Sequence, residues 1–224
     1  VVVMRFVLSL LLSLLPCAAS AEETSMAFDD DSWASDTEAV NEGELEFLDT
    51  PPAEPVHHHI NRIRIGVDSL RDGWVDLHQC HRHLDPVPLL EIVYHPRRIR
   101  RIELLSMENI GSGLVEGSSI VLRDIQRHAS ICLQAESRSL HILGGDRYQL
   151  RNGPYMRKFL DGYYPMRLTL EVDYPADLLD YTALRPLPLD AGRPPPKQGN
   201  LYWDGWFQGR LYTEIEFRTS STDR

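Results

Sequence analysis

The residues best suited to metal binding gather between His78 and His83, where three histidines and one cysteine occupy six positions. Side chains two residues apart on a strand point to the same face, so His81 and His83 share one face and His78 and Cys80 the other. Because imidazole nitrogens suit zinc and copper, we expect a candidate metal site at His81 and His83, with His78 as a further candidate ligand. The donors available as another ligand are His95, His128 and His141. The alternative is that these histidines are hydrogen-bonded interior or edge residues, since His-x-His also occurs by chance.

A second histidine group, His57 to His59, lies where an acidic segment meets the first expected strand. A rigid strand cannot direct three consecutive side chains at one ion. In a flexible hinge they would bind copper, nickel or zinc weakly, but chance or a pH-sensitive hinge is favoured.

Two cysteines follow residue 21, Cys80 and Cys132, each within an expected strand. In an oxidising compartment two such thiols predict a disulfide. In the chain-entropy account, closing a loop of about 50 residues stabilises the fold by about 4 kcal/mol. A Cys-x-x-Cys-His motif is absent from the sequence, which excludes attachment of a c-type haem.

The one strongly basic run is RRIRR at 97–101, in which Arg98 and Arg100 share one face of a strand. A solvated edge strand protected by charge explains this pattern. The functional alternative is an anion site, with Arg98 and Arg100 contacting a glycan, a lipid headgroup, an acidic peptide or the acidic segment of this same chain.

Aromatic residues concentrate near the C-terminus, above all in Tyr202-Trp203-Asp204-Gly205-Trp206. Exposed aromatic rings stack on sugars or peptides, and Asp204 would add a polar contact to Tyr202, Trp203 and Trp206. The alternative is ordinary packing. Asp204-Gly205 also predicts a hairpin turn flanked by the two tryptophans.

No catalytic group can be selected from the sequence, because carboxylates are abundant and spacing singles out none of them. Gly111-Ser112-Gly113 is typical of a turn and lacks the strand–elbow–helix context of a nucleophilic serine. Gly144-Gly145 does not open a helix, which argues against a phosphate-binding loop. A non-enzymatic function is therefore favoured.

The elements that must position these groups are short strands separated by glycine and proline. The clearest is 166–173, where four apolar residues alternate with polar ones. Asp72-Gly73 predicts a hairpin turn, and helix is expected only around 155–161 and after Pro175. Further strands are expected at 74–83, 89–95, 99–105, 119–123, 130–135, 139–143, 148–150 and 211–217. The sequence predicts a mainly antiparallel all-β fold, a β-sandwich or partly open barrel with little helix.

The first 21 residues predict a signal peptide, with an apolar run after Arg5 and the small-x-small pattern Ala19-Ser20-Ala21. The run is about half the length of a membrane-spanning helix. Cys17 raises the alternative of a lipoprotein, but Pro16 stands where such signals place a small residue. We therefore expect a periplasmic or secreted protein, attached to a membrane only if Cys17 is lipidated.

The net charge of −10 is unevenly distributed. Twelve acidic residues and no lysine or arginine lie between residues 22 and 56, whereas residues 57–224 hold 21 acids and 22 bases. The acidic segment also lacks hydrophobic periodicity, which predicts a disordered arm over 22–56. Behind it we expect a β-rich domain at 57–184, a proline-rich loop at 185–200 and a C-terminal hairpin at 201–224 that packs on the domain.

These observations favour an exported, non-enzymatic binding module without a cofactor, for an envelope protein or a glycan. The first alternative is a periplasmic protein that handles copper or zinc through His81 and His83. The second is a cell-envelope hydrolase. Nucleic acid is excluded as a partner, because the chain is directed to export and its core has no net basic excess.

Overall fold

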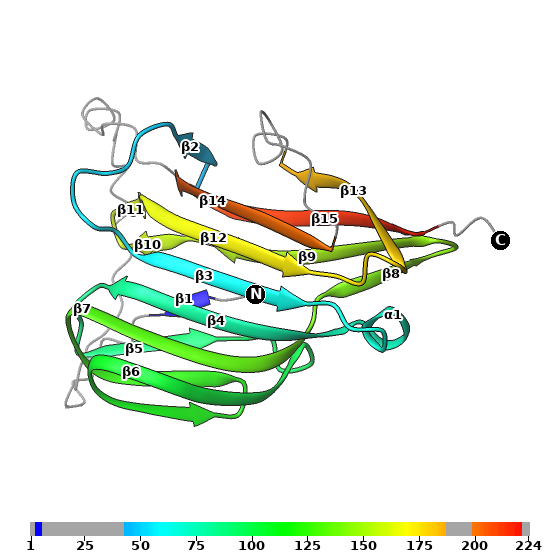
Figure 1. Ribbon diagram of the computed structural model, residues 1–224. Coiled ribbons are helices and arrows are strands. Elements are labelled where there is room, and N and C mark those ends of the chain that lie inside the picture. Colours follow the sequence, from blue (N-terminus) through cyan, green and yellow to red (C-terminus); the bar gives the residue numbers. More distant parts are fainter. Residues whose placement is uncertain (1–2, 6–42, 187–198, 221–224) are drawn as a thin grey trace, which may run out of the picture.

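The computed structural model describes residues 3–5, 43–186 and 199–220, and most of them lie in strands (Figure 1). One short helix, α1 (Ser69–Asp72), accompanies them. The strands are β1 (Val3–Arg5), β2 (Glu46–Leu48), β3 (His58–Arg64), β4 (Trp74–Leu84), β5 (Leu89–Val93), β6 (Ile99–Glu116), β7 (Ser119–Arg138), β8 (Leu140–Gly144), β9 (Arg147–Tyr155), β10 (Arg157–Phe159), β11 (Gly162–Tyr164), β12 (Met166–Asp173), β13 (Leu179–Arg185), β14 (Asn200–Gln208) and β15 (Leu211–Thr219).

Two sheets and a small hairpin account for these strands. The larger sheet has the order β1-β5-β7-β4-β3-β12-β14-β2, with β6 paired to β7. The smaller has the order β13-β15-β9-β8, and β10 pairs with β11. Pairing is antiparallel except between β3 and β12, which are parallel. The strands form no closed barrel, and the prediction of a mainly antiparallel, sandwich-like all-β fold is confirmed.

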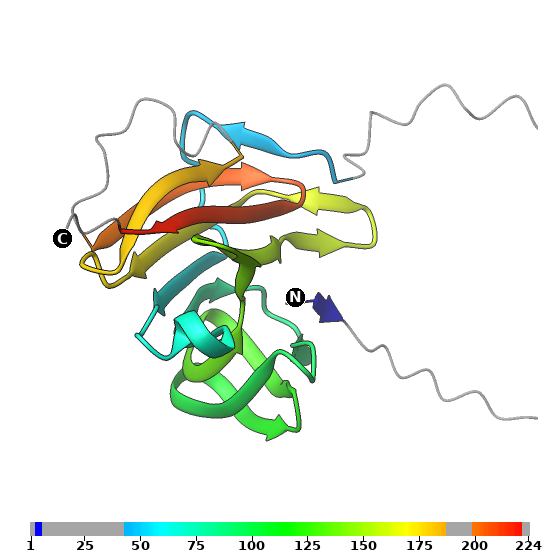
Figure 2. The same ribbon diagram turned by 90° about the vertical axis from the view of Figure 1, so that its right-hand side faces the viewer.

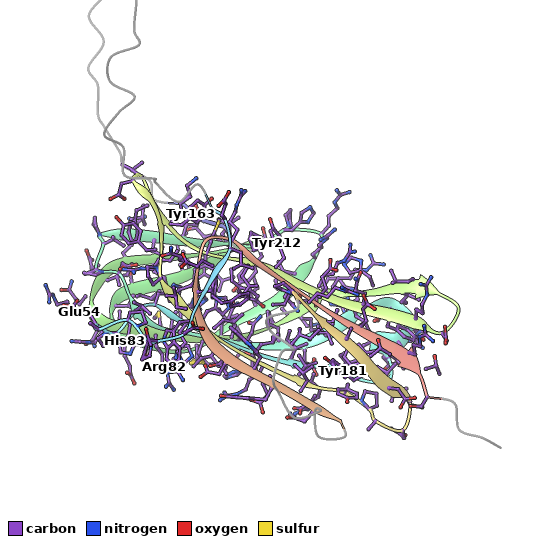
Figure 3. The ribbon with its side chains drawn as sticks, turned by 90° about the horizontal axis from the view of Figure 1, so that it is seen from above. Glu54, Arg82, His83, Tyr163, Tyr181 and Tyr212 are labelled. Carbon is purple, nitrogen blue, oxygen red and sulfur yellow. A yellow bond between two sulfur atoms is a disulfide. The ribbon has the colours of Figure 1, made fainter. Side chains whose placement is uncertain are left out.

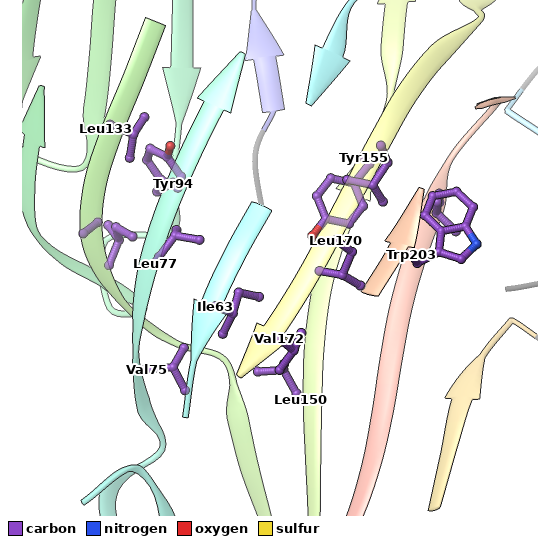
Figure 4. Packing of buried hydrophobic residues seen from close by; sticks show 14 of the residues in the cluster. Ile63, Val75, Leu77, Tyr94, Leu133, Leu150, Tyr155, Leu170, Val172 and Trp203 are labelled. Carbon is purple, nitrogen blue, oxygen red and sulfur yellow. The ribbon is translucent and has the colours of Figure 1, made fainter. Parts of the chain in front are cut away.

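The core fills the space between the two sheets and continues under the curled end of the larger one (Figures 2 and 4). On the sandwich side, Leu150 of β9, Leu170 of β12 and Trp203 of β14 are buried in the core (Figure 4). On the curled side, β7 pairs with β5 through residues 119–123 and with β4 through residues 129–138. Strand β7 therefore joins the parts of the larger sheet that contain β4 and β5, and both parts face the same core.

Strand β7 shows why several expected turns are wrong. The sequence predicts two strands at 119–123 and 130–135, but the chain bends between them without leaving the sheet. Asp124 and His128 adopt positive φ angles of 54° and 60° there, which bends the strand. Its partner β6 likewise continues as a strand through the expected turn at 111–113.

Two other local expectations are also wrong. Asp72-Gly73 ends α1 and makes no hairpin: Gly73 has φ 78° and donates its N–H to the Ser69 carbonyl, a typical helix C-terminus. Residues 155–161 form no helix but the end of β9 and the strand β10, which pairs with β11.

The expected C-terminal hairpin is wrong in its pairing. Strand β14 joins the larger sheet beside β12, whereas β15 joins the smaller sheet between β13 and β9. The chain passes from the larger to the smaller sheet through Gly209, which has φ 90°. A Cβ at this position would lie 1.9 Å from the Glu44 carbonyl oxygen, so the passage requires glycine. Most of the proline-rich loop, residues 187–198, lies outside the described residues.

Part of the segment expected to be a disordered arm is ordered. Over residues 43–56 the chain lies on the larger sheet, where β2 pairs with β14. The physical reason is that Leu45 and Phe47 pack against the core, and the Phe47 ring lies 6.1 Å edge-on from Trp203. Residues 22–42 lie outside the described part. Within that part, no helix is long and apolar enough to cross a membrane.

Candidate anion-binding site

The two histidines expected to form a metal site do not come together. A β-bulge between Arg82 and Leu84, with His83 at φ 53°, breaks the alternation of β4. His83 is exposed as a result and lies beside Arg82 at the surface (Figure 3), whereas His81 is 2% exposed in the interior. His78 lies on the opposite, outer face of β4, as its position in the strand predicts.

His81 instead meets the histidines that precede and begin β3. His57 Nε2 lies 2.9 Å from His81 Nδ1, and the His59 ring centroid lies 4.4 Å from that of His81. The His59 Nε2 atom is held by the Gln79 and Asn61 side chains, at 2.5 and 3.3 Å. Over the described residues, no group of three histidine, cysteine or carboxylate side chains is arranged to hold a metal ion. We call His57, His59 and His81 the histidine core.

The histidine core is kept neutral by its surroundings. Burial, followed by the charges of neighbouring histidines and Arg157, lowers the pKa of His57 to about 3. Burial also places the pKa values of His59 and His81 well below the ordinary range. These rings therefore serve as buried hydrogen-bonding groups at neutral pH.

Two buried tyrosines complete the same polar network. The Tyr94 hydroxyl donates to Gln79 Oε1, and Asn61 Nδ2 donates to the Tyr155 hydroxyl at 2.7 Å. Burial raises the pKa of both phenols, so they also stay neutral. The network fixes the packing where β3 and β4 meet the smaller sheet.

The expected disulfide is present. Cys80 and Cys132 are directly opposite in the β4–β7 pair, with Cα atoms 4.1 Å apart. The bond therefore ties together two strands at the centre of the larger sheet.

The expected aromatic ligand site is dispersed over two faces of β14. Trp203 points inward and is buried, whereas Tyr202 points outward and is exposed. Asp204 is already engaged: it accepts hydrogen bonds from Arg167 at 2.6 and 2.9 Å and from the Thr169 hydroxyl at 2.7 Å. Burial alone would raise the pKa of Asp204, but these hydrogen bonds hold it below its usual value.

Trp206 shares that surface, since the Arg167 guanidinium lies 5.1 Å from its ring centroid. Replacing Asp204 by alanine is expected to lower the free energy of unfolding by about 2 kcal/mol, because Arg167 loses a bidentate partner. Denaturant unfolding measures the change, with Tyr202→Ala as the exposed control on the same strand. Equal stabilities of the two variants would contradict this structural role.

The two arginines proposed from the basic run have different surroundings. Arg100 stacks on Trp74, 4.0 Å from the ring centroid, and pairs with Glu136, which Arg101 also contacts. Arg100 of the edge strand β6 thus has an aromatic partner and shares one carboxylate with Arg101. Arg98 lies on the turn before β6 and faces a different part of the molecule.

Arg98 lines a pocket of about 480 Å³ whose side chains are predominantly basic. We call it the basic pocket. Its lining consists of Arg71, Asp72, Gly73, His95, Arg97, Arg98, Arg138, Leu140, His141 and Ile142. Four arginines and two histidines from separate parts of the chain therefore surround one carboxylate.

Backbone contacts bring these parts together. The Leu140 N–H donates to the Gly73 carbonyl at 3.2 Å, which joins the end of α1 to β8. A Cβ at Gly73 would lie 2.5 Å from the Leu140 carbonyl oxygen, so glycine permits this close approach. The Arg138 N–H donates to the Arg98 carbonyl at 2.9 Å, which joins the end of β7 to the turn before β6.

The basic pocket carries an excess of positive charge. Asp72 Oδ1 accepts a hydrogen bond from the Trp74 N–H, and the Arg71 guanidinium is paired with Asp68. Among the described residues, no ion pair neutralises Arg97, Arg98 or Arg138. The other ion pairs among the described residues involve arginines outside the basic pocket.

The pKa of His141 reflects its burial and the excess of positive charge around it. Partial burial lowers its pKa first, and the charges of Arg151, Arg98 and Arg138 lower it further, against the opposing carboxylate of Glu214. Sequence reasoning found Arg98 but missed Arg71, Arg138 and His141 as its neighbours. No local pattern reveals them, because they are brought to Arg98 only by the folding of three distant segments.

No protein-family model matches the chain, and no curated protein is similar to it in sequence. The class of the protein is therefore described from its structure: it is a sandwich-like, disulfide-linked all-β protein with a cationic surface pocket.

Proposed function

We propose that this protein is an exported binding module that takes an anionic ligand in the basic pocket. The observation that carries the proposal is the unneutralised charge of Arg97, Arg98 and Arg138 around a cavity of about 480 Å³. The three arginines line the same surface pocket, and a pocket lined by one sign of charge attracts ligands of the opposite sign.

The chemistry of the lining favours a phosphate or carboxylate group. Guanidinium groups donate paired hydrogen bonds to such oxyanions, and charge-assisted bonds of this kind are the strongest available at a surface. The cavity volume falls within the usual range for small-molecule sites. A ligand with one anionic group and a small polar body fits this description.

Export supports the choice of partner and is part of the proposal. The disulfide is of the kind that persists in an oxidising compartment, as the signal-peptide pattern of residues 1–21 also predicts. Cleavage after Ala21 would remove β1, whose three residues pair with β5 at the sheet edge. The ligand is then an anionic component of the periplasm, the envelope or the medium.

Titration calorimetry with glycerol phosphate tests the binding. The double variant Arg98→Ala/Arg138→Ala is expected to weaken affinity at least about 100-fold, since each of the two charge-assisted contacts contributes about 1.5–3 kcal/mol. Arg82→Ala removes an exposed arginine from the outer face of β4 and serves as the matched control. Equal binding by all three proteins, or no binding by the parent, would overturn the proposal.

The metal-handling alternative has lost its expected ligand pair, because His83 lies at the surface and His81 in the interior. No observation on the described residues favours the cell-envelope hydrolase. Neither alternative is proposed further.

A further inference from the structure

We infer that the end of the molecule carrying the basic pocket docks on the surface of an anionic phospholipid bilayer. The inference rests on the proposed function, and it identifies the anionic ligand as lipid phosphate presented in a membrane. Its basis is the apolar residues that stand exposed beside the basic pocket.

Two of these residues lie at the tip of the β8–β9 hairpin. Ile142 and Leu143 are each 47% exposed, although both belong to a strand whose first residue, Leu140, is buried. Ile142 also lines the basic pocket. Gly144 and Gly145 follow directly with positive φ angles and form the turn, and nothing lies within 4 Å of the Cβ position of either.

A third exposed apolar residue comes from another segment. Val67 is 67% exposed in the loop that leads into α1. Because α1 packs against β8, this loop lies at the same end of the molecule as the β8–β9 hairpin (Figures 1 and 2). Exposed apolar residues from two separate loops thus lie at the end of the molecule that carries the basic pocket.

The charges at this end suit an anionic membrane. Arg147 follows the hairpin turn and pairs in register with Arg218 of β15. Of the carboxylates at this end, Asp68 pairs with Arg71 and Asp72 accepts the Trp74 N–H, whereas Asp146, Asp177 and Asp180 lie around the hairpin turn and the neighbouring end of β13. Within the basic pocket four arginines accompany one carboxylate, so basic residues remain in excess there.

The combination of exposed apolar residues with arginines favours a bilayer over a small soluble phosphate as the ligand. A soluble ligand would use the arginines and leave Val67, Ile142 and Leu143 in water. At a bilayer surface, by contrast, apolar side chains enter the headgroup region while arginines bind lipid phosphates, and each contribution strengthens the other. Exposed apolar residues beside basic ones are the usual composition of such surfaces.

Vesicle co-sedimentation of the exported protein tests the inference. With vesicles containing about 30% phosphatidylglycerol, we expect binding at least about tenfold tighter than to pure phosphatidylcholine, and weaker as salt rises. Val67→Ser/Leu143→Ser is expected to weaken vesicle binding about tenfold and to leave glycerol phosphate binding unchanged, because neither residue lines the basic pocket. Arg98→Ala/Arg138→Ala is expected to weaken both.

Leu160→Ser is the matched control, because Leu160 is fully exposed in the turn between β10 and β11, at the other end of the molecule (Figure 1). Thermal unfolding verifies that each variant is folded. Binding of glycerol phosphate without binding of vesicles would overturn the docking and leave the proposed function standing. Absence of both would overturn both. Equal loss in the Leu160 variant would overturn the assignment to this end.

Discussion

Lowering the pH from 7 to 5 is expected to reduce the free energy of unfolding by about 6 kcal/mol, because three buried histidines cannot take up protons in the folded state. The unfolded chain binds a proton at each near the ordinary pKa of 6.5, whereas burial lowers the pKa of His57 to about 3. His59 and His81 are shifted in the same direction. Stability is therefore complete above pH 6.5 and is lost as the pH falls, by about 2 kcal/mol per histidine at pH 5.

Other groups around the histidine core do not cancel this loss. Arg157 is paired with Asp85 at 2.6 Å, and Asn61, Gln79, Tyr94 and Tyr155 carry no charge. His58 adds to the loss, since burial first, and then Arg167, lowers its pKa to about 4. Carboxylates whose pKa is lowered, such as Asp204, change protonation only below this pH range.

Urea unfolding at pH 7, 6 and 5 measures the effect. His81→Gln is expected to reduce the difference between pH 7 and 5 by about 2 kcal/mol, whatever it does to stability at pH 7. The exposed His128→Gln is the matched control and should leave the difference unchanged, because His128 is not among the charges that act on the histidine core. The same free energy of unfolding at pH 7 and 5 in the parent protein would show that the histidine core is not buried and neutral.

The fold class could be predicted because alternation of apolar and polar residues is a local property. Residues 166–173 alternate without exception, and the strand β12 has those limits. The same argument applied to β14 would have placed Leu201, Trp203 and Phe207 inward. The turn tendency of Asp204-Gly205 was given more weight there, although Gly205 is needed because its missing Cβ leaves room for the Trp203 ring.

The candidate sites were harder to predict, because they depend on departures from regular strands and on distant contacts. His83 leaves its face through a bulge in which a non-glycine residue has a positive φ angle, and no residue type in the sequence marks it. Arg71, Arg98 and Arg138 lie in three separate segments that only the docking of α1 on β8 and of β7 on the turn before β6 brings together. Alternation predicted the disulfide partners as strand residues, but their register came from the β4–β7 pairing.

Removing the disulfide is expected to lower the free energy of unfolding by about 4 kcal/mol, because the cross-link closes a loop of about 50 residues in the unfolded chain. Cys80→Ala/Cys132→Ala is the direct test, since both side chains lie opposite each other in β4 and β7 and alanine fits strands that already pack closely. Urea unfolding of the exported parent and the double variant at pH 7, above the range in which the histidines titrate, measures the difference.

Reduction provides the internal control for this prediction. Dithiothreitol should lower the stability of the parent toward that of the double variant and should leave the double variant unchanged. Because the cross-link acts on the unfolded chain, the variant should keep its affinity for glycerol phosphate while folded; the basic pocket is formed by α1, β8 and the turn before β6, away from Cys80 and Cys132. Unchanged stability on reduction, with both thiols then free to react, would mean that the bond does not restrict the unfolded chain. Loss of ligand binding in the folded variant would instead mean that the central strands transmit strain to the basic pocket.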